Sequence, residues 1–163
     1  MRAPADRIRE ATYGGLRLRS YLGRKMTITE DEIAGLVDAF YAKVREDARL
    51  GPVFNAAIDD WPKHLVKLQA FWSSVMLTTG RYKGSPMAAH IAHANAIDPA
   101  MFDRWLALWR TTARERLAPE LAESIIAKAE RIGESLKLAL FFRIDADGQL
   151  QMRDRPASGA SGQ

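Results

Sequence analysis

The chain has 163 residues, of which 47% are hydrophobic and 27% charged, the range of a soluble globular domain. It has no cysteine, which excludes disulfides, thiolate nucleophiles, cysteine-ligated zinc, iron–sulfur clusters and cysteine-held haem. Taken over the whole chain, the formal net charge of +4 suggests an anionic partner such as nucleic acid.

The excess positive charge lies at the N-terminus. Residues 1–25 hold seven basic and two acidic side chains, while the rest of the chain holds 17 basic and 18 acidic ones, a net charge of −1. We therefore predict a basic, mobile, non-catalytic extension over 1–25. A weak short helix, or an upstream start before Met26, are the alternatives. Nucleic acid is consequently not the expected partner of the domain.

Apolar runs are too short for targeting or membrane insertion. The extension lacks the apolar core of a secretion signal, and no later run reaches the length that spans a bilayer. A cytoplasmic protein that does not bind membranes is predicted.

Helical periodicity dominates the predicted working domain, 26–143. Thr29 and Glu32 form a capping box, and apolar residues then recur at spacings of three and four, which predicts a first helix. This helix is predicted to end before Gly51-Pro52, and an irregular or one-turn segment follows.

Aspartates and prolines mark the later helices. Asp60 and Asp98 are predicted N-caps, each followed by a proline in the first turn, where its missing N–H does no harm. Further helices are predicted over about 61–79, 86–94, 99–117 and 119–142. No pair of strands is predicted, although Phe141–Ile144 could extend briefly. The fold class is all-α, and 144–163 is predicted to be a disordered C-terminal tail.

Only three histidines are available for metal chemistry. A single histidine on an apolar helical face is usually an inert, hydrogen-bonded core residue. However, His64 shares its face with Phe71 and Trp72, and His90 lies on a separate short helix, so the two could flank one flat apolar ligand. Counting His93 as the third, these residues lack the spacing of a zinc site.

Other polar or aromatic residues allow two interpretations each. Tyr41 lies on an apolar face, either as a core tyrosine bonded to a backbone carbonyl or with its hydroxyl in a pocket. Trp72 and Trp105 could equally be ordinary core residues or line a ligand pocket. A Gly-x-Ser-x-Gly elbow and a phosphate-binding loop are both absent from the sequence.

The order of these motifs resembles the group III, or P-type, truncated haemoglobins, over about residues 28–142. The resemblance is carried by several stretches in sequence: Phe40–Asp47, Leu50–Phe54, Trp61–Leu65, Phe71-Trp72, Arg81–His90 and Phe102–Trp109. It implies an all-α truncated globin, a two-on-two (2-on-2) helical sandwich around one haem b.

The resemblance also assigns roles by motif position. His90 corresponds to the proximal iron ligand, and Tyr41, His64 and Trp105 fall in the pocket where a ligand binds and reacts. Haem contacts are expected from residues that match the family or that could supply an apolar wall and a basic rim for the propionates: Phe54, Leu68, Phe71, Trp72, Arg81, Tyr82, Lys83 and Met87.

Two features depart from the family pattern. His93 stands where a hydrophobic residue is expected, and the stretch from it to Trp105 is slightly long, so His93 is a rival axial ligand. The basic extension 1–25 is the second departure. The spacing Gly84-x-Pro86-x-x-x-His90 favours His90.

The function implied is a haem globin that reversibly binds O₂, NO, CO or similar ligands. NO-detoxifying (NO dioxygenase) and peroxide (pseudo-peroxidase) chemistry with an unidentified reductase stay open. Tyr41 is the first choice of hydrogen-bond donor to the ligand and Trp105 the second, with His64 as donor or gate. The alternatives are a haem-free helical interaction or nucleic-acid-binding domain that uses the basic arm, and a gas sensor that signals through another protein.

Overall fold

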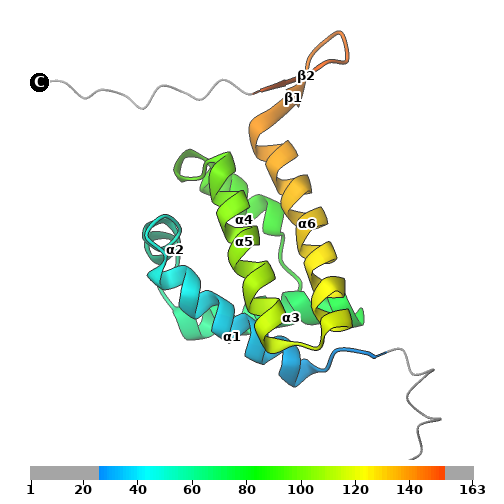
Figure 1. Ribbon diagram of the computed structural model, residues 1–163. Coiled ribbons are helices and arrows are strands. Elements are labelled where there is room, and N and C mark those ends of the chain that lie inside the picture. The colour runs from blue at the N-terminus through cyan, green and yellow to red at the C-terminus, as the bar shows by residue number, and fades with distance from the viewer. Residues whose placement is uncertain (1–25, 153–163) are drawn as a thin grey trace, which may run out of the picture.

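The computed structural model describes residues 26–152, which form six α-helices, one short 3₁₀ helix and two short strands (Figure 1). The predicted extension 1–25 and residues 153–163 lie outside the described residues. In chain order the elements are α1 (Glu30–Glu46), α2 (Gly51–Ala57), α3 (Trp61–Leu77), α4 (Pro86–Ala92), η2 (Ala94–Ala96), α5 (Pro99–Arg116), α6 (Pro119–Phe141), β1 (Phe142–Ile144) and β2 (Leu150–Met152).

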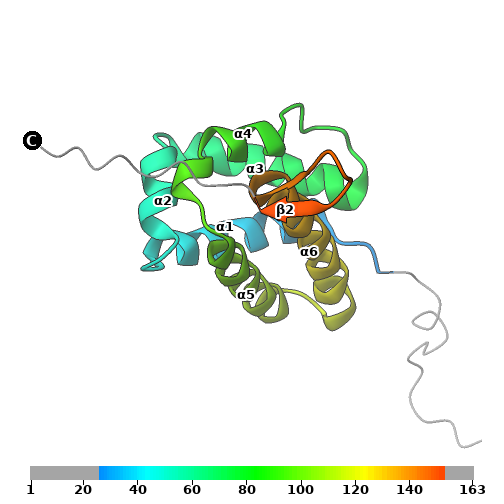
Figure 2. The same cartoon turned by 90° about the horizontal axis from the view of Figure 1, so that it is seen from above.

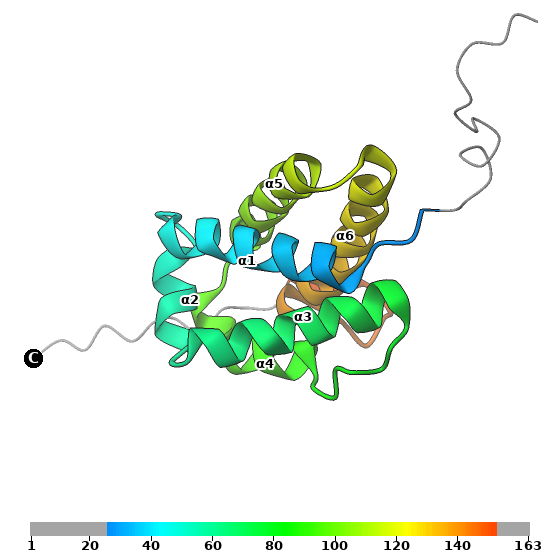
Figure 3. The same ribbon diagram turned by 90° about the horizontal axis from the view of Figure 1, so that it is seen from below.

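The helices form two crossed pairs. Helices α5 and α6 lie side by side, and α1 packs on both α5 and α3 (Figure 1). Seen from above and from below, α1 lies between α3 on one side and α5 on the other (Figures 2 and 3). This is the predicted two-on-two sandwich of α1 and α3 with α5 and α6. Within the described residues, no helix is long and apolar enough to cross a membrane.

The helix starts follow the predicted capping chemistry. The Thr29 side chain accepts from the Glu32 N–H at 3.2 Å, and the Glu32 carboxylate accepts from the Thr29 N–H at 2.8 Å, so the capping box is complete. Asp60 and Asp98 cap α3 and α5 by accepting backbone N–H bonds at 3.0 Å. Sequence signals of this kind are local, which is why these three predicted boundaries agree with the structure.

Gly51-Pro52 does more than break the chain, because it also begins α2. The proline occupies the first turn of this helix. A Cβ added to Gly51 would lie 2.6 Å from the carbonyl oxygen of Arg45, so only glycine allows α2 to fold back this closely on α1. The predicted one-turn segment is therefore a seven-residue helix, and it brings Phe54 toward the end of α1.

The hydrophobic core is divided into two clusters of buried residues. The larger lies among α1, α3, α5 and α6 and includes Phe40, Trp72 and Trp109. The smaller is centred on Phe102 of α5 and two leucines of α6, with residues of α4 packed against it. Within residues 26–152, α3 approaches α4, α5 and α6 at few points. The two clusters are therefore not closed into one core.

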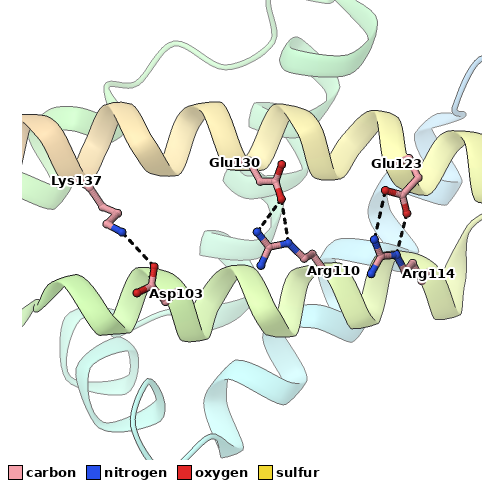
Figure 4. A network of polar contacts seen from close by, with 6 residues as sticks. All are labelled: Asp103, Arg110, Arg114, Glu123, Glu130 and Lys137. Atoms are coloured by element: carbon pink, nitrogen blue, oxygen red, sulfur yellow. Dashed lines mark hydrogen bonds and ion pairs between the residues drawn. The ribbon is translucent and has the colours of Figure 1, made fainter.

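Three ion pairs run along the seam between α5 and α6 (Figure 4). They are Lys137–Asp103 at 3.1 Å, Arg110–Glu130 at 2.7 Å and Arg114–Glu123 at 2.8 Å. Their side chains are partly or largely exposed, so each pair contributes on the order of 0–1 kcal/mol to stability. The three ion pairs align α5 with α6, while buried apolar surface supplies most of the stability.

A β-hairpin after α6 corrects two predictions, the absence of paired strands and the disordered tail over residues 144–152. Strands β1 and β2 pair antiparallel, with Ile144 opposite Leu150. The Asp145 carboxylate accepts from the Gln149 N–H at 2.8 Å, and Gly148 adopts a φ of +77°, which glycine favours. This turn chemistry closes the hairpin, although each strand is only three residues long.

Candidate functional site

His90 lies on α4, where a proline and a serine cap set the start of the helix. The Ser85 hydroxyl accepts from the Ala88 N–H at 3.2 Å, and Pro86 occupies the first turn. The His90 side chain is half-buried, and its Nδ1 lies 2.7 Å from the Pro86 carbonyl oxygen. A carbonyl only accepts, so Nδ1 carries the proton and Nε2 keeps a free lone pair. This is the orientation in which an imidazole is a metal ligand.

Tyr41 of α1 and Trp105 of α5 form a polar pair inside the larger cluster. Tyr41 is 4% exposed, and Trp105 is half-buried. Burial raises the pKa of Tyr41, and a hydrogen bond from the Trp105 indole N–H to the hydroxyl oxygen offsets a smaller part of this rise. Since the indole only donates, the Tyr41 O–H stays available to donate a hydrogen bond to a ligand.

His64 of α3 is half-buried beside Trp61, with ring centroids 6.0 Å apart and the rings edge to face. Burial lowers the pKa of His64, and the positive charge of Lys67 lowers it further. The imidazole is therefore neutral near pH 7, and one of its nitrogens can accept a hydrogen bond.

We expect an NMR titration to give His64 a pKa below its ordinary value of about 6.5. Lys67→Gln should raise this pKa, because it removes the repulsive charge, whereas Lys63→Gln should leave it unchanged. His64 binds a proton more readily in the unfolded chain than in the folded one. Its protonation therefore lowers the free energy of unfolding as the pH falls below about 6.5. A pKa of 6.5 or above in the parent chain would contradict the structure.

Trp61 is a residue whose role sequence reasoning missed. Its indole N–H donates to Asn55 at 3.2 Å, the Asn55 amide donates to the Arg45 carbonyl at 3.2 Å, and the Arg45 guanidinium lies 4.9 Å from the Trp61 ring centre. Trp61 also contacts Tyr41, at 6.1 Å between ring centroids. Trp61 thus fixes the start of α3 next to Tyr41 and His64. The sequence shows it only as one more aromatic residue on the stripe of α3.

Most of the predicted apolar wall is half-buried on four different elements. Phe54 on α2, Leu68 and Phe71 on α3, and Trp105 on α5 border the larger cluster, while Met87 on α4 borders the smaller. Half-buried apolar side chains on facing elements are what a large flat hydrophobic cofactor needs.

Trp72 differs from these wall residues. It is 2% exposed and stacks on the fully buried Trp109 at 4.4 Å between ring centroids. The structure therefore places Trp72 within the core cluster.

The loop between α3 and α4 carries the predicted rim residues. Tyr82 is half-buried, its N–H donates to the Ser74 hydroxyl at 2.9 Å, and its ring contacts Phe71 at 5.3 Å. Arg81 pairs with Glu30 at 3.2 Å, which draws its charge toward α1. Lys83 is exposed and belongs to none of the ion pairs found among residues 26–152.

His93, the rival ligand, lies apart from this set. It is exposed at the end of α4 and lines a hollow of about 270 Å³ together with residues of α2 and η2. That hollow includes none of the wall residues, nor His64, Tyr41 or Trp105. His90, which is half-buried and contacts Phe102 at 6.1 Å between ring centroids, lies against the smaller cluster.

The donor set fits haem. Among the described residues, no group of three histidine, cysteine or acidic side chains could hold a metal ion. A porphyrin brings four nitrogen ligands of its own, so a single imidazole with a free Nε2 meets the remaining need. His90 has that orientation, and the half-buried wall residues pack against both clusters.

A two-on-two helical sandwich with one oriented histidine and a buried tyrosine beside a half-buried tryptophan is the arrangement expected of the truncated globin class. No family model matches the chain. The group 3 truncated haemoglobin ctb of Campylobacter jejuni is 32% identical over 119 residues, covering 71% of this chain and 93% of that protein. The crystal structure of group III truncated haemoglobin from Campylobacter jejuni matches with a TM-score of 0.66 and 31% identity, over 71% of this chain and 93% of the other. The chain belongs to the group 3 truncated haemoglobin family.

Membership of a haemoglobin family implies a haem cofactor and small gaseous ligands such as O₂. The expected family and fold are thereby confirmed. The roles of the individual site residues stay predictions, and they are taken up next.

Proposed function

We propose that this protein binds haem b through Nε2 of His90 and reversibly binds O₂ and other diatomic ligands on the side of Tyr41. The observation that carries the proposal is the His90 imidazole, whose Nδ1 is committed to the Pro86 carbonyl at 2.7 Å. That bond fixes the tautomer and directs the free lone pair, which is how proteins orient an imidazole that binds a metal.

Residues on the other side provide hydrogen bonds. Haem b held by His90 would supply an iron that binds a diatomic ligand. A ligand that gains negative charge within reach of Tyr41 would accept a hydrogen bond from its hydroxyl, and Trp105 holds that hydroxyl by donating to its oxygen. Hydrogen bonds to charged groups contribute about 1.5–3 kcal/mol. His64, neutral and half-buried, either donates as well or closes the pocket as a gate.

The remaining predicted residues hold the cofactor. Phe54, Leu68, Phe71 and Met87 exclude water from its faces, with Trp72 supporting Phe71 from the core at 5.4 Å between ring centroids. The propionates would lie near the α3–α4 loop, where Lys83 and the backbone around Tyr82 are available and Arg81 is shared with Glu30.

Reaction with NO or peroxide is the second candidate function. The observation that favours it is the pairing of two N–H or O–H groups, on Tyr41 and Trp105, at one buried point. Such a pair slows ligand escape, which suits a reaction on the bound ligand better than O₂ delivery. Turnover would then need an electron donor, and we infer a reductase in the cytoplasm.

Optical spectra of the purified chain after haem addition test the proposal directly. We expect a Soret band in the ferric and ferrous forms and a shifted band after CO is added, which reports an accessible ligand side. A colourless chain that binds DNA in a salt-dependent manner would overturn the proposal in favour of the haem-free alternative.

A further inference from the structure

Three of the four tryptophans form one stack. The rings of Trp105 and Trp109 lie 5.3 Å apart at 7°, and those of Trp109 and Trp72 lie 4.4 Å apart at 19°, measured between centroids and ring planes. Stacked indoles stabilise a core, but leucine or phenylalanine could fill the same volume. Near-parallel overlap is also the arrangement in which an electron moves readily between neighbours, because tunnelling decays steeply with the gap.

The two ends of the stack lie in different surroundings. Trp105 lies near Tyr41 at the proposed ligand pocket, and both rings contact Phe40, at 5.0 and 4.8 Å between ring centroids. At the other end Trp72 contacts Phe71 at 5.4 Å, and Phe71 contacts Tyr82 at 5.3 Å between ring centroids. Tyr82 is half-buried in the loop between α3 and α4. A continuous line of aromatic rings thus joins the pocket to the surface.

The middle ring is the only one with an unsatisfied donor among the buried side chains described. Trp109 is 0% exposed, and its Nε1–H has no hydrogen-bond partner. An indole that loses an electron becomes acidic at Nε1, and here no acceptor takes the proton. The electron vacancy is therefore not trapped at Trp109 by proton loss, and it passes on. Tyr82 can release its phenolic proton to water, so the vacancy stops there.

We propose that the Trp105–Trp109–Trp72 stack carries single oxidising equivalents from the ligand pocket through Phe71 to Tyr82, where a small anionic donor of the enediol class is oxidised. The proposal rests on the proposed function, because the pocket must hold haem. Exposed Lys83, next to Tyr82, supplies positive charge that attracts an anionic donor, while Arg81 on the other side of Tyr82 is paired with Glu30.

The electrons balance with two co-reactants, a hydroperoxide and the enediol. Cleavage of the hydroperoxide O–O bond would take up two electrons, one from the haem and one from Trp105. Electrons then move from Trp109, from Trp72 and finally from Tyr82, whose proton goes to water. One enediol returns one electron and one proton to the Tyr82 radical, and a second enediol would return the other electron and proton to the haem, so that one hydroperoxide becomes water and an alcohol or a second water.

The test uses the full haem-loaded chain in its ferric form, one equivalent of hydrogen peroxide and a nitroso spin trap. Mass spectrometry of the peptides should find the adduct on Tyr82. Trp109→Phe and Trp72→Phe should lose this adduct, while the matched control Ile126→Val, a change at a buried core residue outside the stack, should keep it. An unchanged Tyr82 adduct in Trp109→Phe, or none in the parent chain, would overturn the relay.

A haem-independent measurement separates the relay from the proposed function. Azidyl radicals from pulse radiolysis take one electron from an accessible indole and become azide. The transient indolyl absorption should convert into phenoxyl absorption in the parent chain and lose that conversion in Trp109→Phe and in Tyr82→Phe. Soret and CO spectra are recorded on the same preparations, so a colourless chain counts against haem binding alone. Near-ultraviolet circular dichroism checks that each variant is folded. If Trp109→Phe does not fold, Trp72→Phe is used in its place to interrupt the stack.

Discussion

His90→Ala is expected to abolish stable haem binding. Nε2 of His90 is the only protein ligand proposed for the iron, and loss of residues that merely orient a ligand already costs about 10–100-fold in metal affinity. We therefore expect the haem affinity of His90→Ala to fall by more than about 100-fold. Haem transfer to an apoglobin acceptor measures this loss, and resonance Raman spectra should no longer show the stretch between iron and histidine. Added imidazole should restore part of the Soret band.

His93→Ala is the matched control. Its imidazole is exposed and lies in the hollow beside α2, so its removal should leave both haem affinity and the iron–histidine stretch unchanged. The reverse pattern, in which His93→Ala loses the stretch and His90→Ala keeps it, would transfer the ligand role to His93.

Tyr41→Phe is expected to speed O₂ dissociation by about 10- to 150-fold, the factor that corresponds to a lost hydrogen bond of about 1.5–3 kcal/mol to a charged group. The side chain is buried, and burial keeps its hydroxyl protonated, so the substitution removes a donor with little change in shape. Stopped-flow mixing of the oxygenated protein with CO measures the rate. CO dissociation should change far less, because bound CO carries little negative charge.

Trp105→Phe separates the two donors of the pair. If Trp105 acts by holding the Tyr41 hydroxyl, its replacement should raise the O₂ dissociation rate less than Tyr41→Phe does. The double variant should then add little to Tyr41→Phe alone, since coupled residues are not additive. Unchanged O₂ dissociation in both single variants would rule out the proposed donor pair.

The sequence predicted elements whose signals are short-range. The Thr29 box and the capping aspartates act within one turn, so their helices begin as expected. The hairpin was missed because strands of three residues give almost no alternation to detect. The hairpin depends instead on the pairing of Ile144 with Leu150 and on the Asp145 carboxylate, which accepts a hydrogen bond from the Gln149 N–H across the turn.

The site shows the same division. His90 and Tyr41 were expected from a resemblance in motif order, and α4 and α1 present them as half-buried and buried side chains. In contrast, the hydrogen bond from Trp61 to Asn55 and the unpaired Nε1–H of Trp109 arise from contacts between helices. Such contacts depend on the crossing of helices, which residue spacing along one helix does not contain. His93 was left as a rival for the same reason, because its position beside α2 is set by the fold and not by its spacing from His90.

The two separate core clusters determine which part of the chain opens first. Helices α1, α5 and α6 bury the larger cluster together with one face of α3, so their amide hydrogens should exchange only when the whole chain unfolds. Helix α4 is short and reaches the body mainly through α6, so its amides should exchange by local opening. His90 lies on this helix, so we expect local opening of α4 to displace His90 while the other helices stay folded. Haem release should then follow the rate at which α4 opens.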